Sequence, residues 1–191
     1  MTYIALPPLS TGAAIGHDWI RIPDDMCLPT DRRTIAALID RVFPEISTRF
    51  SDPAYLTQRT IMTPLNTTVE LLNEKIMSML PGEEVRVDSA DSVIQDEDAF
   101  LVPVEFLNGL NPSGFPPHTL RLKIGAPVML LRNLDSANGL SNGTRMIVHK
   151  ITPRLLDVEI LGGQHGGKRV WICRIPMVAE PELTGADVPY R

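Results

Sequence analysis

Short stretches in which apolar and charged residues alternate dominate the second half of the chain and constrain its fold most strongly. Leucine, valine and isoleucine alternate with basic residues over 120–124 and with acidic residues over 156–160. A period of two is typical of β-strands that bury one face. With the apolar runs between them, the predicted strands are 120–124, Val128–Leu131, Arg145–Ile151, 156–160 and Lys168–Ile175. Strands of this length and spacing predict a small β-barrel of about 60 residues.

Glycine-rich turns separate these strands. Two Asn-Gly pairs lie within 135–143, and the segment Gly162–Gly167 is predicted to be the tip of a hairpin. With Lys168, this second segment also matches most of a phosphate-binding loop. Arg169, however, stands where a serine or threonine would hold magnesium, and the residues after it continue a strand. Because a phosphate-binding loop must open a helix, we expect no nucleotide site here.

The first half of the chain is predicted to be irregular at its start, with one short strand over Trp19–Ile22. A helix is predicted over about 32–43, where apolar residues recur at helical spacing and Thr30 or Asp31 can cap the first turn. Residues 83–99 are acidic and weakly patterned and are predicted to be an exposed loop. Residues 103–118, rich in proline, glycine and asparagine, are predicted to be a connector.

Residues 55–80 predict a strand, a turn and a helix. Thr60–Thr63 has the pattern of a short buried strand, and Thr67 with Glu70 forms a capping box for a helix that runs to Met79. The open amides at such a helix start lie where α/β sheets bind anions. Asn66, Thr67 and Thr68 are therefore candidate phosphate contacts, and simple helix capping is the alternative.

The charge of the chain is divided unevenly. The net charge is −5 overall, but residues 121–174 contain nine basic and three acidic residues. A basic segment in an acidic chain is a candidate surface for a polyanion, although an ordinary solvated face is the alternative.

Other function classes find little support in the sequence. No apolar run approaches the length of a membrane helix, and we expect no membrane contact. The two cysteines and four histidines show no metal-ligand spacing, and no motif marks a catalytic triad. We therefore expect no metal site and no self-contained active site.

The stretch LKIGAPVMLLRNLDSANGLSNGTRMIV, residues 122–148, is the most specific signal in the chain. With PSGFPPHTL before it, it resembles the accessory-domain signature of Pif-type DNA helicases of superfamily 1B, including those carried by Helitron transposons. The segments YLTQRTIMTPLNTTVELLN (55–73), EFLNGL (105–110) and WICRIPM (171–177) resemble the same family in the same order. The resemblance covers about residues 50–178.

The resemblance implies an α+β fold, with a partial RecA-like α/β motor-domain fragment plus a small SH3-like β-barrel. Residues 1–104 would hold an irregular N-terminal region and part of the second motor domain. Residues 105–178 would form the barrel, which resembles the 2B accessory domain, and 179–191 would be a truncated return to the motor domain.

The resemblance also implies a partner and a cofactor. The family steps along single-stranded DNA using ATP and Mg²⁺, but the motif GxxxxGK[ST] and a matching Asp-Glu magnesium motif are not recognisable in this sequence. ATP hydrolysis needs a phosphate cradle, magnesium ligands and a charge-stabilising arginine. We therefore expect no cofactor in this chain and no ATPase or helicase activity from it alone.

The expected function is weak binding of single-stranded DNA through neutralisation of its phosphates. Candidate contacts are Lys123, Arg132, Asn133, Asn142, Thr144, Arg145 and Lys168 on the barrel, with Asn66 and Thr67 on the motor fragment. A tight turn at Asn142 and an ion pair between Arg132 and Asp135 are the structural alternatives. Trp171 and Phe115 are the obvious stacking platforms in the basic half.

Two other functions stay open at this point: a protein-interaction module, since small SH3-like barrels bind peptides, and a non-functional relic derived from a transposon. We expect a monomer that works with the missing half of the helicase motor. The two cysteines, which form no disulfide framework, indicate an intracellular protein, and the family implies the nucleus or, as the alternative, the mitochondrion.

Overall fold

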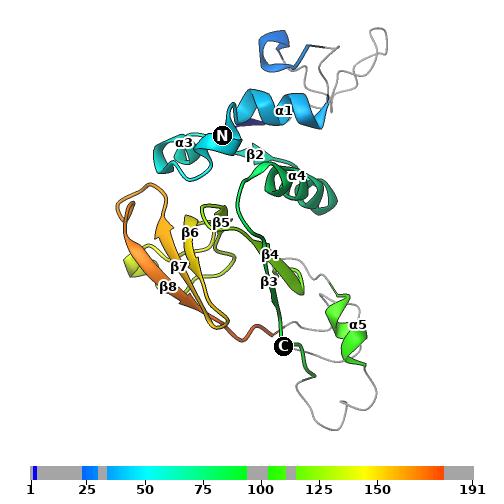
Figure 1. Cartoon of the computed structure of the whole chain (residues 1–191), viewed down its shortest axis with the longest axis vertical. Coiled ribbons are helices and arrows are strands. Elements are labelled where there is room, and N and C mark those ends of the chain that lie inside the picture. Colours follow the sequence, from blue (N-terminus) through cyan, green and yellow to red (C-terminus); the bar gives the residue numbers. More distant parts are fainter. Residues whose placement is uncertain (1, 4–22, 30–33, 94–102, 111–114, 179–191) are drawn as a thin grey trace, which may run out of the picture. The chain divides into compact units, whose positions relative to one another are not determined.

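The computed structural model describes residues 2–3, 23–29, 34–93, 103–110 and 115–178 (Figure 1). The chain separates into two compact units, Met1–Pro81 and Gly82–Arg191. Helices and sheets are both present, which confirms the prediction of a mixed helix and sheet fold. Among the described residues, no helix combines the length and the apolar character needed to cross a membrane.

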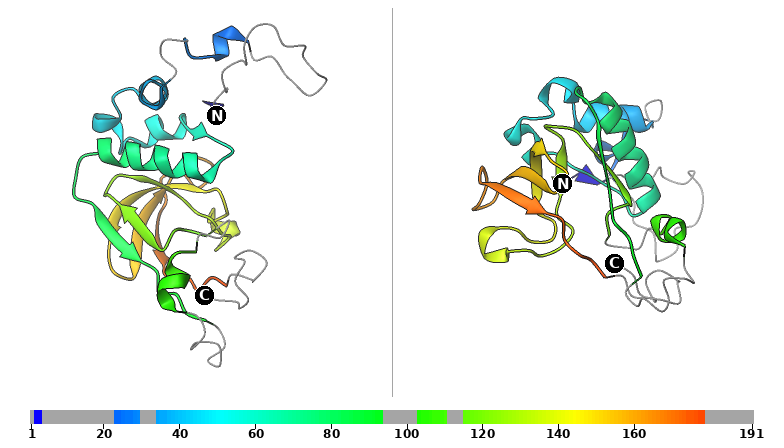
Figure 2. Two further views of the ribbon diagram at one scale, coloured as in Figure 1. Left: turned by 90° about the vertical axis from the view of Figure 1, so that its right-hand side faces the viewer. Right: turned by 60° about the horizontal axis from the view of Figure 1, so that its bottom comes forward.

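Helices dominate the first unit (Figures 1 and 2). Its strands β1 and β2 are two residues long and pair in parallel. The predicted strand Trp19–Ile22 lies outside the described residues. In chain order the elements are β1 (Thr2–Tyr3), a 3-10 turn (Asp24–Met26), α1 (Ile35–Val42), α2 (Ile46–Arg49), α3 (Pro53–Thr57), β2 (Ile61–Met62) and α4 (Asn66–Met79).

Helix α1 confirms the helix predicted over about 32–43, but its cap differs from the prediction. The hydroxyl of Thr34 accepts a hydrogen bond from the amide of Ala37 at 3.1 Å, so Thr34 caps the helix in place of Thr30 or Asp31. Ile39 and Val42 are buried, in agreement with the predicted apolar face.

Tyr55 of α3 anchors the short helices of this unit. Its side chain is 1% exposed. Its hydroxyl donates to the carbonyl of Pro44 at 2.9 Å, and the guanidinium groups of Arg49 and Arg59 lie 4.6 and 4.4 Å from the ring centroid. Since a buried hydroxyl needs a partner and an aromatic face attracts cations, these contacts fix α2 against α3.

The strand, turn and helix predicted over 55–80 are present, with two corrections. Helix α4 begins at Asn66 and its N-cap is Leu65, whose side chain makes no capping hydrogen bond. The predicted capping box of Thr67 and Glu70 is therefore wrong, because Thr67 already lies inside the first turn. Strand β2 is not fully buried, since Met62 is 45% exposed.

Two strands open the second unit. Strand β3 (Val85–Asp88) pairs antiparallel with β4 (Thr119–Leu122), so the prediction of an exposed loop over 83–99 is wrong for β3. The carboxylate of Glu84 accepts two hydrogen bonds of 2.8 Å from Arg121, and Asp88 accepts one of 2.8 Å from Thr119. The acidic side chains that suggested a solvated loop are partners of the neighbouring strand.

Helix α5 (Val104–Asn108) replaces part of the predicted connector. Leu107 is 1% exposed and packs with Val93, Leu110 and Phe115 in a small cluster of its own. The segment has a weak helical pattern, and burial of the Leu107 side chain stabilises the helix.

The pairing of β3 with β4 predicts a dependence of stability on pH. The Arg121 guanidinium beside Glu84 holds the pKa of that carboxyl below its usual value of 4.5. A carboxyl with a lower pKa in the folded state stabilises the fold fully above its unfolded pKa, and this contribution is lost as the pH falls through the folded pKa. We expect Glu84→Gln to lose less stability than the parent between about pH 5 and pH 3 in urea titrations. Glu83→Gln, an exposed neighbour, is the control, and equal losses in all three proteins would contradict the assignment.

A four-stranded antiparallel sheet forms the rest of the second unit, in the order β5-β6-β7-β8. The strands are β5 (Pro127–Met129), β6 (Arg145–Ile151), β7 (Leu155–Ile160) and β8 (Arg169–Cys173). The predicted strands at β6, β7 and β8 are confirmed, as is the bend before β5, where Gly125 has φ 85°. The core on one face of the sheet consists of Leu130, Leu140, Met146, Val148, Val158 and Ile160.

The predicted barrel is not closed in the part of the chain that the structure describes. Closure requires the first and last strands of a sheet to pair. Strand β4 pairs with β3 in a separate sheet, and β5 and β8 remain the two edges of the open four-stranded sheet. The pair of Glu84 and Arg121 joins the β3 segment to β4, and the bend at Gly125 separates β4 from β5.

Candidate nucleic-acid interface

The long loop between β5 and β6 has a fixed backbone. The amide of Leu130 donates to the carbonyl of Thr144 at 2.9 Å, and the amide of Gly143 donates back to Leu130 at 2.8 Å. Further in, Asp135 and Leu140 form an isolated antiparallel bridge. Gly139 and Gly143 have φ angles of 85° and 86°, a region that favours glycine. The loop is therefore an ordered hairpin-like extension of the sheet.

Three predicted contact residues hold this loop together. The side-chain oxygen of Asn133 accepts a hydrogen bond of 2.8 Å from the backbone amide of Asn142. The hydroxyl of Thr144 donates to the carbonyl of Gly139 at 2.9 Å and accepts from the amide of Ser141 at 3.2 Å. Asn133 and Thr144 thus have structural roles, whereas the side chain of Asn142 lies on an exposed residue.

The hairpin between β7 and β8 packs against the same loop. The ammonium of Lys168 donates to the side-chain oxygen of Asn138 at 2.8 Å. The ring of His165 lies so close to Gly139 that a Cβ there would be 2.7 Å from its Cδ2 atom. We name residues 132–145 together with 162–168 the loop cluster. It brings together Arg132, Asn133, Asn142, Thr144, Arg145 and Lys168, which are six of the seven predicted barrel contacts.

Within the part of the chain that the structure describes, no carboxylate pairs with Arg132 at the base of the loop cluster. Its guanidinium lies 5.2 Å from the centroid of the Phe115 ring, a neutral partner. The alternative partner, Asp135, instead accepts hydrogen bonds from Asn138 at 3.2 and 2.7 Å. Arg132 is exposed and is placed to meet an anion.

Two other predicted contacts are less accessible. Lys123 is only 9% exposed. Arg145 is half-buried, and burial lowers the pKa of its guanidinium below its usual range. Both side chains are partly or largely removed from water in the folded chain, so neither presents a fully solvated cation to a ligand.

The predicted contacts on α4 belong to the first compact unit. Asn66 and Thr67 are exposed in the first turn of the helix, and Thr68 is half-buried. They form a candidate group separate from the loop cluster.

Some of the basic residues in 121–174 form ion pairs with carboxylates. A count of charges along the sequence does not show these pairs. Arg121 pairs with Glu84, and Arg169 pairs with the buried Asp157. Lys150, Arg154 and Arg174 are exposed, as are Arg132 and Lys168. The exposed positive charge therefore depends on these five residues.

Asn138 and His165 were not among the predicted contact residues. Neither residue type nor its spacing predicts a ligand contact. Both residues hold the two loops of the loop cluster together, and these loops are about 30 residues apart in the sequence. The Asn138-Gly139 turn was visible in the sequence, but its partner hairpin was not.

The hairpin residues Gly162–Gly167 do not fit a phosphate-binding loop. The amide of Gly167 donates to the carbonyl of Ile160 at 2.9 Å, and β8 follows directly. The loop amides thus close a β-hairpin rather than opening a helix. Within the described ranges, no three His, Cys, Asp or Glu side chains gather as a metal site.

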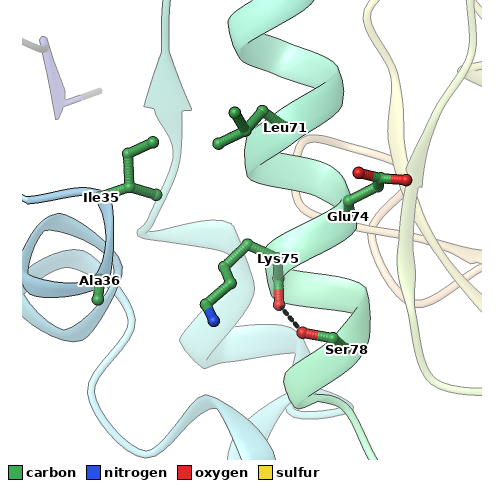
Figure 3. Close-up of a pocket in the computed structure, with 6 residues that line it drawn as sticks. All are labelled: Ile35, Ala36, Leu71, Glu74, Lys75 and Ser78. Atoms are coloured by element: carbon green, nitrogen blue, oxygen red, sulfur yellow. Dashed lines mark hydrogen bonds between the residues drawn. The ribbon is translucent and has the colours of Figure 1, made fainter.

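An open hollow of about 420 Å³ lies between α1 and α4 in the first unit (Figure 3). Figure 3 shows Ile35 and Ala36 on one side and Leu71, Glu74, Lys75 and Ser78 of α4 on the other. The Ser78 hydroxyl donates to the carbonyl of Lys75 within its own helix, so it is not an activated nucleophile.

Part of the second unit is similar to a known protein family. Residues 105–151 match the family model described as DNA helicase Pif1, 2B domain. The matched range contains α5, β4, β5, the loop before β6 and β6 itself. The chain thus contains a segment that is similar to a helicase accessory domain.

The helicases concerned are of the Pif type, as the sequence predicts. The ATP-dependent DNA helicase PIF1 of Xenopus laevis is 39% identical over 82 residues, which make up 43% of this chain and 11% of that protein. The protein of the same name from Danio rerio is 38% identical over 85 residues, or 44% of this chain and 12% of that protein. The chain is related to Pif-type DNA helicases and matches a small part of their length.

One solved structure matches part of this chain. It is described as the structural basis for DNA unwinding at forked dsDNA by two coordinating Pif1 helicases, and it is 21% identical to this chain. The match covers 70% of this chain and 29% of that chain, with a TM-score of 0.39, a value too low to establish a shared fold.

Proposed function

We propose that the chain contributes single-stranded DNA binding and strand guidance to a Pif-type helicase. In this proposal the second unit corresponds to the SH3-like 2B domain, and the strand-turn-helix unit at β2 and α4 corresponds to the start of a RecA-like second motor domain. The observation that carries the proposal is the loop cluster, which presents Arg132, Asn142 and Lys168 from two ordered loops.

The physical basis is neutralisation of phosphates by cations that keep their charge. Arg132 faces an aromatic ring and Lys168 bonds a neutral amide, so neither is neutralised by these contacts. Such contacts bind a nucleic-acid backbone with little sequence preference and release counterions. The net charge of −5 opposes binding at long range, so we expect weak affinity.

The motor would be supplied by the remainder of the helicase, with ATP and Mg²⁺ held by residues other than these. We therefore propose that the 191-residue chain alone hydrolyses no ATP, that it acts as a monomer and that it works on DNA in the nucleus. ATP turnover above a buffer control would overturn the first of these points.

The decisive experiment is a salt titration of oligothymidine binding, read by fluorescence anisotropy. We expect the parent chain to bind with an affinity that falls steeply as salt rises. Arg132→Gln and Lys168→Gln should each weaken binding and reduce the slope of log affinity against log salt by about 1. Arg86→Gln is the control, because it removes the same charge from a residue of β3 with a 70% exposed side chain.

Two results would contradict the proposal. If Arg86→Gln weakens binding as much as the loop variants do, the attraction is not localised at the loop cluster. If no oligonucleotide binds at low salt, the alternative of a peptide-binding module or a non-functional relic gains support.

A further inference from the structure

Asn108, Asn138 and Asn142, all in the second unit, are each followed directly by a glycine. An asparagine before glycine is prone to lose its side-chain amide, because glycine has no side chain that hinders the approach of its backbone nitrogen to the asparagine Cγ atom. The three pairs consist of the same two residue types. The folded structure therefore decides which of them reacts first.

The reaction is a covalent rearrangement that needs only water as a co-reactant. The glycine nitrogen attacks Cγ of the asparagine, and a bond between these two atoms forms. The bond from Cγ to the side-chain nitrogen breaks, and this nitrogen leaves as ammonia with the proton of the glycine amide. Water then opens the cyclic imide at either carbonyl, which gives aspartate or isoaspartate. The product carries a negative charge that asparagine lacks.

The attacking nitrogen is hydrogen-bonded at all three sites. The glycine amides donate to backbone carbonyls at 2.8 Å (Gly143 to Leu130), 3.2 Å (Gly139 to Ser136) and 3.1 Å (Gly109 to Phe106). Each pair therefore reacts from a locally opened form of its turn. These bonds do not favour Asn142, so the choice among the sites depends on the asparagine side chains and the space around them.

The carboxamide of Asn138 is held at both of its ends. Its nitrogen donates to Asp135 at 2.7 Å, and its oxygen accepts from the ammonium of Lys168 at 2.8 Å. A Cβ atom at Gly139 would lie 2.7 Å from the His165 ring, so the space beside this glycine is filled. The side chain can turn toward the glycine nitrogen only after both bonds break.

Asn108 is held within helix α5. The residue is half-buried in the last turn of the helix. In the amide orientation that matches donors with acceptors, its side-chain nitrogen donates to the carbonyl of Val104 and to the carboxylate of Asp91, both at 3.2 Å. Two hydrogen bonds and the end of the helix must therefore open before this pair can react.

Asn142 has a carboxamide that can turn freely. The residue is exposed, and within the described part of the chain its side chain makes no hydrogen bond, since the bond to Asn133 involves its backbone amide. A Cβ atom at Gly143 would meet nothing within 4 Å. The reaction here requires release of the Gly143 amide from Leu130, but no neighbour of the side chain has to move.

We propose that Asn142 is a site of spontaneous modification, which converts to aspartate or isoaspartate ahead of Asn138 and Asn108. The modification itself does not depend on the proposed function, but its consequence does. The new carboxylate would lie in the loop cluster, in the same loop as Arg132, and would repel phosphates. Conversion therefore weakens the binding of oligothymidine.

Mass spectrometry of the folded chain, aged at mildly alkaline pH, tests the site. Conversion adds about 1 Da. Asn138 and Asn142 share the tryptic peptide 133–145, so fragment ions must assign the change. We expect Asn142 to convert at least about fivefold faster than Asn138 or Asn108, because each of these has further hydrogen bonds to break. In urea the three sites should react at similar rates.

Asn142→Gln is the matched control, because glutamine keeps the carboxamide but does not form the same ring. We expect ageing to weaken oligothymidine binding by the parent several-fold and to leave each aged Asn142→Gln sample equal to its own fresh sample. Conversion of Asn138 or Asn108 as fast as Asn142 in the folded chain would overturn the site, as would an unreactive Asn142 in a chain that reacts in urea. If the converted parent binds as tightly as the fresh one, the consequence is wrong and the site stands. If the fresh parent does not bind, the proposed function fails and the mass measurement still decides the site.

Discussion

Gly139→Ala is expected to destabilise the second unit by about 3 kcal/mol, the sum of backbone strain and a steric clash. Gly139 has φ 85°, a conformation that costs an L-residue about 1–2 kcal/mol. An added Cβ would also lie 2.7, 2.8 and 2.9 Å from Cδ2, Cγ and Cβ of His165. The Cβ of His165 is close to its backbone, so the hairpin at 162–168 must move with it.

Gly143→Ala separates these two effects. Gly143 has φ 86°, but a Cβ there would meet nothing within 4 Å, so only the strain of about 1 kcal/mol applies. Urea unfolding of both variants measures the difference.

A second substitution tests the clash itself. His165→Ala in the Gly139→Ala background should restore part of the lost stability, because it removes the contacts of 2.7 and 2.8 Å with Cδ2 and Cγ and leaves the contact of 2.9 Å with Cβ. If the two glycine variants are equally stable, or if His165→Ala gives no recovery, the packing of the two loops is not as described. The same variants should weaken oligonucleotide binding in the order of their stability losses, because the loop carries Arg132 and Asn142.

The ion pair between Arg169 and Asp157 should respond unequally to the removal of its two partners. The side chain of Asp157 is 7% exposed and that of Arg169 is 57% exposed. Arg169→Met leaves a buried carboxylate without its cation and should cost about 2–3 kcal/mol, less than for a fully buried pair. Asp157→Asn leaves an exposed guanidinium and an amide that still accepts a hydrogen bond, and should cost about 1 kcal/mol.

The comparison needs a control for loss of an arginine. Arg86→Met removes a side chain that is 70% exposed and should change the free energy of unfolding by less than about 0.5 kcal/mol. Equal costs for Arg169→Met and Asp157→Asn would mean that solvent compensates the carboxylate and that Asp157 is not effectively buried.

The amino-acid sequence by itself determined the strands β6, β7 and β8, the turn-rich loop before β6 and the resemblance to Pif-type helicases. These features depend on residues close together in the chain. Alternation along a strand and Asn-Gly turns are local signals, and the long stretch 122–148 carries a family pattern that a few scattered residues do not.

The tertiary structure alone decided which strands pair and which predicted contacts are accessible. Strand β3 was not recognised in its acidic segment, because Asp88 and the preceding Glu84 are bonded to Thr119 and Arg121, more than 30 residues away in the sequence. Lys123 is buried, and Asn133 and Thr144 are used within the loop, although their residue types suggested contacts with a ligand. The packing of His165 on Gly139 depends on two loops meeting in space, and no local pattern encodes such a distant contact.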